Sequence, residues 1–376
     1  MNGSKIIKVL MHPLVAAIVA ILIGLLIGAI VMLVAGYDPK AAYEALFDGI
    51  FGKPRYLVNI VIKATPIILT GLSVAFAFKT GLFNIGAEGQ YMIGATTAAI
   101  LGYVLILPAA IHIPIVIIGA MLTGAVWSGI AGLLKAKWDI HEVITTIMLN
   151  WIALYLQNFL IMQSWLKKPN SESSYEVRDS ARVSILGEWK FSDAGKEWAQ
   201  SNPEMGDILL RTDVNAGIIL AVAAAILIGF ILKRSTLGYS LKAVGFNRFA
   251  AEASGIDIKK NTILSMCIAG AVAGLSGCLN TVGSNPFRIG VLSVSEGYGF
   301  DGISVALIAH SSPIGCILSA LLLSGLRYGG QSLQSELGVP SEVISIIIGV
   351  IVFIIAISTI FNMLNTAMEK RRSRKL

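Results

Sequence analysis

Asn84, Glu88 and Gln90 stand among four glycines in GLFNIGAEGQYMIGA, residues 81–95, between two long apolar runs. Glycines weaken helix continuity, and non-helical backbone at membrane depth is tolerated only where protein or a water-filled cavity satisfies it. An interrupted helix can offer backbone groups, Asn84 and Glu88 to a polar solute. The alternative is a turn at the cytoplasmic interface, with Glu88 favourably placed near a helix N-terminus. The residues alone leave both interpretations open.

A second glycine-rich stretch, SVSEGYGFDGISVALIAHSSP at 293–313, carries Glu296 and Asp301 into an apolar run. Carboxylates within a membrane span are costly, and by default they indicate a functional site that faces a cavity. The alternative places both carboxylates at an external mouth, where they cap the following helix. For Asp301 we favour the cap.

Two amides lie inside apolar runs, Asn150 in VITTIMLNWIALYLQN and Asn280 in GLSGCLNTVGSN. An amide in such a place must hydrogen-bond to a neighbouring helix or to a ligand, and pairing between helices is the more frequent use. We expect Asn84, Asn150 and Asn280 to face the interior of the helix bundle. The candidate residues of a solute path are Asn84, Glu88, Gln90, Asn150, Asn280, Glu296 and Asp301.

The composition indicates that these elements lie in a lipid membrane. The 376 residues are 55% hydrophobic and only 14% charged, which excludes an ordinary soluble domain. The net charge of +7 is explained by Lys and Arg gathered in cytoplasmic loops, so it does not indicate nucleic acid as a partner. We therefore predict an all-α, polytopic membrane protein.

Metal and nucleotide motifs are missing from the sequence. Cys267, Cys278 and Cys316 lie in apolar stretches without zinc-ligand spacing, and the histidines lack partners at metal spacing. No GxxxxGK[ST] occurs, so this chain does not bind ATP through a P-loop. We expect no metal and no cofactor in this chain, and any ATP hydrolysis must come from another subunit.

Apolar runs of about 20 residues predict the membrane spans. A short external loop is expected at 36–56, and the pair of short runs after residue 297 can instead be broken or re-entrant helices. We predict ten spans, near 14–35, 57–78, 88–107, 113–134, 142–163, 214–232, 262–283, 298–311, 313–329 and 341–362.

The distribution of basic residues places both termini in the cytoplasm. The chain then forms a single transmembrane domain over 1–376, and its two halves have opposite orientation because an odd number of spans precedes the second. This is the topology of an inverted repeat, a common transporter plan. Its parts are a first half at 13–163, an extracytoplasmic insert at 164–213, a second half at 214–362 and a basic tail at 363–376.

The cytoplasmic segment KRSTLGYSLKAVGFNRFAAEASGIDIKKN, residues 233–261, has the length of a short amphipathic helix with flanking turns. A helix rigidly joined to two spans can dock onto a cytoplasmic partner. The alternative is a basic loop that lies on anionic lipid. The segment is richer in Ala and Gly than a loop built only for charge requires.

Four segments together resemble a known family: TPIILTGLSVAFAFKTGLFNIGAEGQYMIGA, EVITTIMLNWIA, GYSLKAVGFNRFAAEASGI and EGYGFDGISVALIA. They resemble the permease subunits of bacterial ABC importers in the branched-chain amino acid, ribose and nucleoside group. The resemblance is closest to the larger permease of nucleoside importers that are served by basic membrane lipoprotein-type receptors. It covers nearly the whole chain except the insert at 164–213.

The resemblance implies a type II importer fold in the bacterial inner or plasma membrane. It also implies a second permease, an ATPase subunit with two nucleotide-binding domains that holds ATP and Mg²⁺, and an extracytoplasmic lipoprotein that delivers the solute. By the same resemblance, Gly238 to Gly255 corresponds to the loop that contacts the ATPase. The coupling residues are then Gly238, Leu241, Ala243, Gly245, Asn247, Arg248, Ala250, Ala251 and Gly255.

We expect a transport subunit that moves a small polar solute, most readily a nucleoside, and performs no covalent chemistry. An ABC permease for a sugar or a branched-chain amino acid stays open. An ion-coupled secondary transporter would use Glu88 or Asp301 as its proton or cation site. An intramembrane enzyme would need clustered acidic, His or metal-binding residues, and none occurs at suitable spacing.

Overall fold

The structure is a computed structural model that describes residues 13–187, 189–355 and 357. The regular elements in these ranges are helices, and extended pairing is limited to three isolated bridges. The all-α prediction is confirmed. The predicted basic tail at 363–376 and the end of the last predicted span lie outside the described residues.

The chain divides into two compact units, unit 1 with Met1–Tyr56 and Gly325–Leu376, and unit 2 with Leu57–Ser324. The predicted division into halves at 13–163 and 214–362, with its inverted relation, stays a prediction.

The described part of unit 1 contains α2 (Pro13–Val34), α3 (Pro39–Phe51) and a helix at Glu342–Ile355. The predicted connection at 36–56 contains a helix, since α3 occupies most of it, and its external side stays a prediction. Asp38 caps α3 by accepting a hydrogen bond from Lys40 N at 3.0 Å, and Pro39 takes the first helical position.

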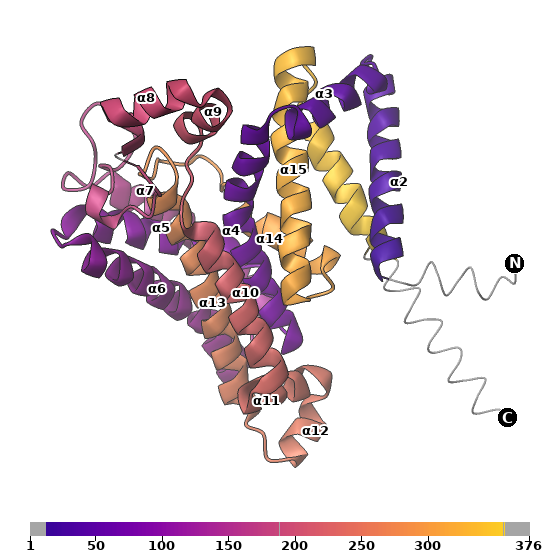
Figure 1. Cartoon of the computed structure of the whole chain (residues 1–376). Helices are drawn as coiled ribbons and strands as arrows, with labels where there is room; N and C mark the ends of the chain where they lie inside the picture. The colour runs from indigo at the N-terminus through magenta and orange to yellow at the C-terminus, as the bar shows by residue number, and fades with distance from the viewer. Residues whose placement is uncertain (1–12, 188, 356, 358–376) are drawn as a thin grey trace, which may run out of the picture. The chain divides into compact units, whose positions relative to one another are not determined.

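Unit 2 holds most of the long helices (Figure 1). They are α4 (Pro54–Lys79), α5 (Ala87–Val104), α6 (Ala109–Trp138), α7 (Glu142–Ile161), α10 (Gly217–Arg234), α13 (Ile258–Gly283), α14 (Tyr298–Ile308) and α15 (Pro313–Leu337), the last of which continues into unit 1.

The centre of unit 2 is α13, which packs against both α5 and α6. Glycines allow these backbones to approach closely: a Cβ on Gly274 would lie 2.3 Å from Ala120 O, and one on Gly94 would lie 2.2 Å from Gly274 O. Small residues at such crossings are typical of helix packing in membranes. The close packing holds α5, which follows the interrupted segment, in a fixed position.

Seven helices among the described residues are long and apolar enough to cross a membrane. The helices α5, α14 and Glu342–Ile355 fall within three further predicted spans, but they are shorter or more polar. The prediction of a multi-pass helical membrane protein is confirmed, whereas the count of ten spans is not.

The insert at 164–213 forms an ordered cap built from η1 (Asp179–Ala181), η2 (Trp189–Phe191), α8 (Asp193–Ser201) and α9 (Pro203–Arg211). Its first part pairs with the loop that follows α13: Ser174 N donates to Ile289 O at 2.9 Å, and Val177 N donates to Phe287 O at 2.8 Å. The insert is therefore joined to the loop by backbone hydrogen bonds.

The cytoplasmic segment at 233–261 contains two short helices, α11 (Thr236–Phe246) and α12 (Arg248–Ala253), where we predicted one. Asn247 separates them and caps α12 by accepting a hydrogen bond from Ala250 N at 3.1 Å. In Figure 1, α11 and α12 lie at the end of unit 2 opposite to α8 and α9. The insert and the segment at 233–261 thus occupy opposite ends of the same helix bundle.

Candidate functional site

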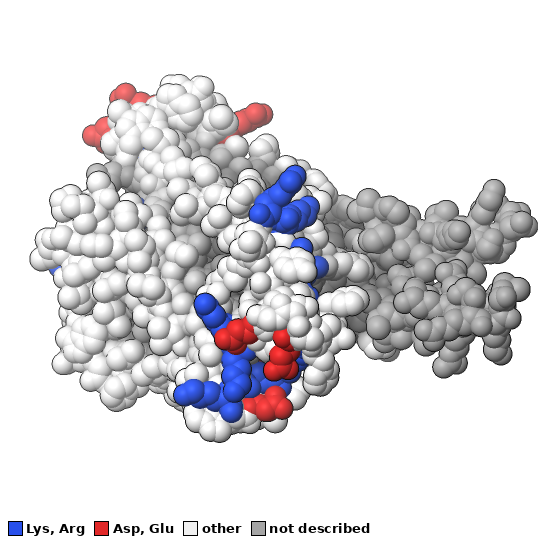
Figure 2. Space-filling view, turned by 90° about the horizontal axis from the view of Figure 1, so that it is seen from below, with Lys and Arg blue, Asp and Glu red and all other residues white. Residues whose placement is uncertain are grey.

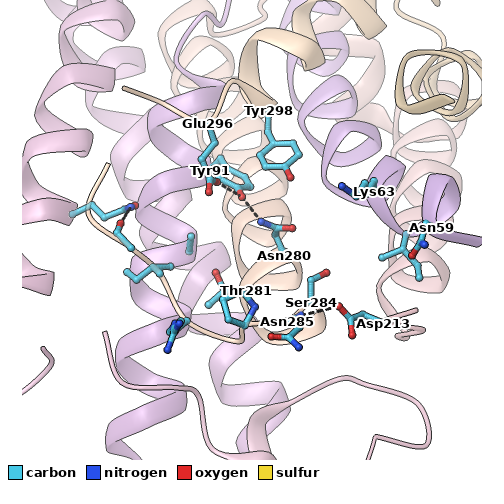
Figure 3. A pocket seen from close by; sticks show the side chains of 17 residues that line it. Asn59, Lys63, Tyr91, Asp213, Asn280, Thr281, Ser284, Asn285, Glu296 and Tyr298 are labelled. Atoms are coloured by element: carbon cyan, nitrogen blue, oxygen red, sulfur yellow. Dashed lines mark hydrogen bonds between the residues drawn. The ribbon is translucent and has the colours of Figure 1, made fainter. Parts of the chain in front are cut away.

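A polar cavity of about 300 Å³ lies in unit 2, among α4, α5, α7, α13 and the loop that leads to α14 (Figure 3). This volume is at the lower end of the range of about 300–1,000 Å³ for small-molecule sites. Four charged side chains line the cavity, together with amides and hydroxyls. The polar lining consists of Asn59, Lys63, Tyr91, Gln157, Asp213, Asn280, Thr281, Ser284, Asn285, Arg288, Glu296 and Tyr298.

A chain of hydrogen bonds runs along one wall of the cavity. Asn280 Nδ2 donates to the Tyr91 hydroxyl at 2.6 Å, and that hydroxyl donates to Glu296 Oε2 at 2.7 Å. The centroids of the Tyr91 and Tyr298 rings lie 5.1 Å apart, and the ring planes are tilted by 39°. Figure 3 shows Glu296, Tyr91 and Asn280 in sequence at one side of the cavity. The Glu296 carboxylate is therefore held by the Tyr91 hydroxyl, which Asn280 holds in turn.

The insert contributes to the same cavity. Asp213, at the end of the insert, lines the cavity and accepts a hydrogen bond from Asn285 N at 3.0 Å. Arg288 also lines it and forms an ion pair with Glu176 of the insert, at 3.6 Å between nitrogen and oxygen. The insert is therefore part of the cavity wall.

Asn84 and Gln90 form a reciprocal amide pair away from the cavity. Asn84 Nδ2 donates to Gln90 Oε1 at 3.0 Å, and Gln90 Nε2 donates to Asn84 Oδ1 at 2.9 Å and to Ser128 Oγ at 3.0 Å. Asn84 Oδ1 also accepts from Gly86 N at 3.1 Å. These bonds satisfy the polar groups of the interrupted segment between α4 and α5.

Asn150 on α7 serves the same segment. Its Oδ1 accepts from Gly89 N at 2.8 Å, and its Nδ2 donates to Ile85 O at 3.1 Å. Asn84 and Asn150 are buried and Asn280 is half-buried, as expected for amides that face the interior. Only Asn280 of the three lines the cavity. The place of Asn84, Gln90 and Asn150 on a solute path stays a prediction.

Glu88 joins the two glycine-rich stretches. Its carboxylate accepts hydrogen bonds from Gly297 N at 2.8 Å and from Gly299 N at 2.5 Å, so it caps the N-terminus of α14. A Cβ on Gly299 would lie 2.2 Å from Glu88 N, which explains the glycine at this contact. Asp301 is buried in the first turn of α14. The carboxylate that bonds these two backbone N–H groups is thus Glu88.

Of the predicted path residues, the structure brings Asn280 and Glu296 together at the cavity. Sequence reasoning missed Lys63, Tyr91 and Arg288. A lysine within a predicted span was a usable signal, because basic groups at membrane depth face a cavity or the bundle interior. Tyr91 and Arg288 carried no such signal, since their neighbours come from other elements.

The predicted coupling residues divide into an inner and an outer set. Gly238, Leu241 and Ala251 are buried, and Ala243 is half-buried. Gly245 packs against the end of α4: a Cβ there would lie 2.4 Å from Lys79 O. The outer set, which is exposed, consists of Gly245, Asn247, Arg248, Ala250 and Gly255.

Two phenylalanines project from the same corner, with Phe246 95% and Phe249 85% exposed. Figure 2 views the structure from this end and shows basic and acidic side chains side by side. A groove of about 680 Å³ beside α12 is lined by both signs of charge, including Lys137, Asp139 and Arg248. Mixed charge and exposed aromatic rings are typical of a protein-docking surface and differ from a purely basic loop.

Comparison with known proteins agrees with this architecture. Residues 56–356 match the family model described as branched-chain amino acid transport system / permease component. The chain is 40% identical to the guanosine ABC transporter permease protein NupP of Bacillus subtilis, over 88% of this chain and 89% of the relative. It is 35% identical to the nucleoside ABC transporter permease protein NupB of Lactococcus lactis, over 89% and 88%.

A third relative is the glucose ABC transporter permease protein TsgB13 of Haloferax volcanii, at 32% identity over 88% of this chain and 84% of the relative. No solved structure matches the chain. Among the described residues, no group of three or more His, Cys, Asp or Glu is placed to hold a metal ion.

Proposed function

The chain belongs to the family of branched-chain amino acid transport system permease components, and from that premise we propose that it forms the path of an ATP-driven importer for nucleosides. It is a permease subunit of an ABC transporter, a transport component and not an enzyme. Relatives that carry guanosine and nucleosides support the proposed solute. The glucose permease relative makes a sugar the alternative.

The observation that carries the proposal is the polar cavity. It is lined by Glu296, Asn280 and Tyr91, which are joined by hydrogen bonds. Groups of this kind replace the hydration shell of an uncharged polar solute by hydrogen bonds. The cavity therefore supports passage of a solute that is rich in hydroxyl and amide groups.

An ion-coupled transporter is the second candidate considered, with Glu88 or Asp301 as the titrating site. Both oxygens of Glu88 accept backbone N–H groups from the start of α14. A carboxylate used in this way supplies acceptors for backbone N–H groups that have no partner within the helix. This geometry supports a structural role for Glu88 and favours ATP-driven transport.

The importer requires subunits in addition to this chain. We propose a second permease as partner, because Bacillus subtilis has a further guanosine permease, NupQ, that also matches this chain at 26% identity. The ATPase subunit, with two nucleotide-binding domains that hold ATP and Mg²⁺, docks on the surface formed by Phe246, Arg248, Phe249 and Ala250. An extracytoplasmic lipoprotein delivers the solute at the insert.

The proposed orientation follows from the positions of these surfaces. The insert faces the exterior of the bacterial cell membrane, α11 and α12 face the cytoplasm, and both termini are cytoplasmic. This assignment is supported by the location of the insert and of α11 and α12 at opposite ends of unit 2. It also agrees with the exposed Lys233 and Arg234 at the end of α10.

The function is tested by uptake of radiolabelled guanosine, uridine and glucose in cells that express the complete importer. Loss of ATP hydrolysis in the ATPase subunit should abolish nucleoside uptake, while an ionophore that collapses the proton gradient should leave it intact at constant ATP. Uptake that survives loss of the ATPase and stops with the ionophore would refute an ATP-driven importer. Uptake of glucose without either nucleoside would refute the proposed solute.

A further inference from the structure

The aromatic rings at the cavity are not arranged to sandwich a nucleobase. Tyr91 is only 1% exposed, so its ring face is not open to a solute. The centroid of the Tyr298 ring lies 5.1 Å from that of Tyr91, and the two ring planes are tilted by 39°, so the pair does not offer two parallel faces. These two are the aromatic residues among the seventeen described residues that line the cavity. Recognition of a base by stacking normally uses open aromatic faces.

One wall of the cavity carries a hydrogen-bond acceptor, the Glu296 carboxylate. The Tyr91 hydroxyl accepts from Asn280 Nδ2 and donates its own proton to Glu296 Oε2. An ionised carboxylate can accept about four hydrogen bonds, and the bond from Tyr91 uses one of these positions. Glu296 also lines the cavity, so acceptor positions beyond the one that Tyr91 uses can serve a solute there.

Vicinal hydroxyl groups fit this acceptor. Two neighbouring O–H groups of a ribose can each donate to the same carboxylate, and a hydroxyl can also accept from donors on the opposite wall. Figure 3 shows Lys63 and Asn59 facing the cavity from α4, across from Asn280. Such mixed donor and acceptor walls suit hydroxyl groups better than the flat apolar faces of a base.

We propose that Glu296, oriented by the Tyr91 hydroxyl that Asn280 holds in turn, accepts hydrogen bonds from the vicinal hydroxyls of the solute. The cavity then recognises the sugar of the solute and tolerates different bases. The inference rests on the proposed function and deepens it. Glu296 is the residue that contacts the solute. Tyr91 is a positioning residue that acts through the carboxylate.

The test compares ribonucleosides with their 2′,3′-dideoxy analogues in cells that carry the complete importer. Uptake is measured below saturation and divided by the occupancy of the isolated receptor for each solute, so that selection by the receptor is removed. Wild type should import guanosine roughly tenfold faster than dideoxyguanosine, as expected for hydrogen bonds to a charged acceptor. Glu296→Gln should lose this preference and slow guanosine and uridine by the same factor.

Tyr91→Phe should reduce the preference for the ribonucleoside less than Glu296→Gln does, because the carboxylate stays but loses its orienting hydroxyl. Glu336→Gln, which removes an exposed carboxylate in α15, is the matched control and should keep the wild-type preference. The amounts of each variant in the assembled complex are measured in the same membranes. These values separate slower transport from poor folding.

Equal losses for guanosine and dideoxyguanosine in Glu296→Gln would overturn the proposal, as would a loss for guanosine without one for uridine. If wild type imports glucose and no nucleoside, the proposed solute is refuted, and the same variants are compared on glucose and its deoxy analogues. A loss of glucose uptake in Glu296→Gln, without a loss for the deoxy analogues, would then support Glu296 as the acceptor for hydroxyls. An unchanged ratio of glucose uptake to deoxy-analogue uptake in that variant would overturn the proposal.

Discussion

At the scale of single residues, polar groups in this membrane protein serve two different purposes. Asn150 and Asn84 hydrogen-bond to the backbone between α4 and α5, where helical bonding is interrupted. Asn280 and Glu296 line the cavity instead. Buried backbone groups that lack a partner are costly in lipid, so the first purpose is needed for the fold before any solute is bound.

The role of Asn150 predicts a loss of stability. In Asn150→Ala the buried Gly89 N–H loses its acceptor, which should cost about 1–3 kcal/mol. The measurement is thermal unfolding of the purified permease in detergent. Gln163→Ala is the control, because Gln163 is half-buried and its described bond goes only to Phe159 O within the same turn. A wild-type melting temperature together with slow uptake would assign Asn150 to the solute path instead.

At the scale of elements, the sequence pattern located most helices but missed some of their boundaries. Long apolar runs predicted α4, α6, α7 and α13, because twenty apolar residues have few alternatives to a spanning helix. The helix α3 was missed, although Asp38 and Pro39 form a standard start signal, because its apolar content is too low for a span. The pairing of the insert with residues 287–291 joins segments more than 100 positions apart, and no local pattern encodes it.

The insert and the loop at 287–291 should stay paired during transport. Ser173 and Gly290 lie directly opposite one another in an antiparallel bridge. This places their Cα atoms near the spacing of about 4.4–6.8 Å that a disulfide requires. The double variant Ser173→Cys with Gly290→Cys should cross-link on oxidation and retain uptake, with each single variant as its control. Uptake that falls on oxidation and returns with a reductant would show that the two segments must separate.

The corner between α11 and α12 predicts the effects of two substitutions on docking. Arg248→Glu tests charge and Ala250→Asp tests packing, and both should prevent co-purification of the ATPase while the permease stays inserted. Lys233→Glu, at the end of α10, is a control for binding through basic charge alone. If only the charge-reversing variants Arg248→Glu and Lys233→Glu had an effect, the segment would be a lipid-binding loop. Normal assembly in both test variants would refute docking here.

At the scale of the whole molecule, a series of packed contacts within unit 2 leads from the corner between α11 and α12 toward the cavity. Gly245 of α11 touches the turn at 79–81, and that turn leads into the interrupted segment. Glu88 then joins the start of α5 to the start of α14 beside Glu296. The two glycine-rich stretches were visible in the sequence, but their direct contact through Glu88 depends on tertiary packing. Continuity alone does not show coupling, so it requires a functional test.

The contact at Gly245 provides that test. In Gly245→Ala the added methyl carbon would lie 2.4 Å from Lys79 O and 2.8 Å from Thr80 C, so α11 must shift away from the end of α4. The exposed rings of Phe246 and Phe249 are left unchanged, and the ATPase should still bind. We therefore expect ATP hydrolysis to continue while guanosine uptake falls several-fold, which uncouples the two activities.

The matched control for Gly245→Ala is Gly229→Ala in α10, where the added methyl carbon would meet nothing nearer than 3.9 Å. This variant should keep wild-type uptake and wild-type ATP hydrolysis. Both activities are measured on the same reconstituted importer, and the ratio of solute moved to ATP consumed is the readout. A wild-type ratio in Gly245→Ala would show that motion reaches the cavity without the contact between α11 and α4. Loss of ATPase binding would instead place Gly245 in the docking surface, because coupling through this glycine requires the ATPase to stay attached.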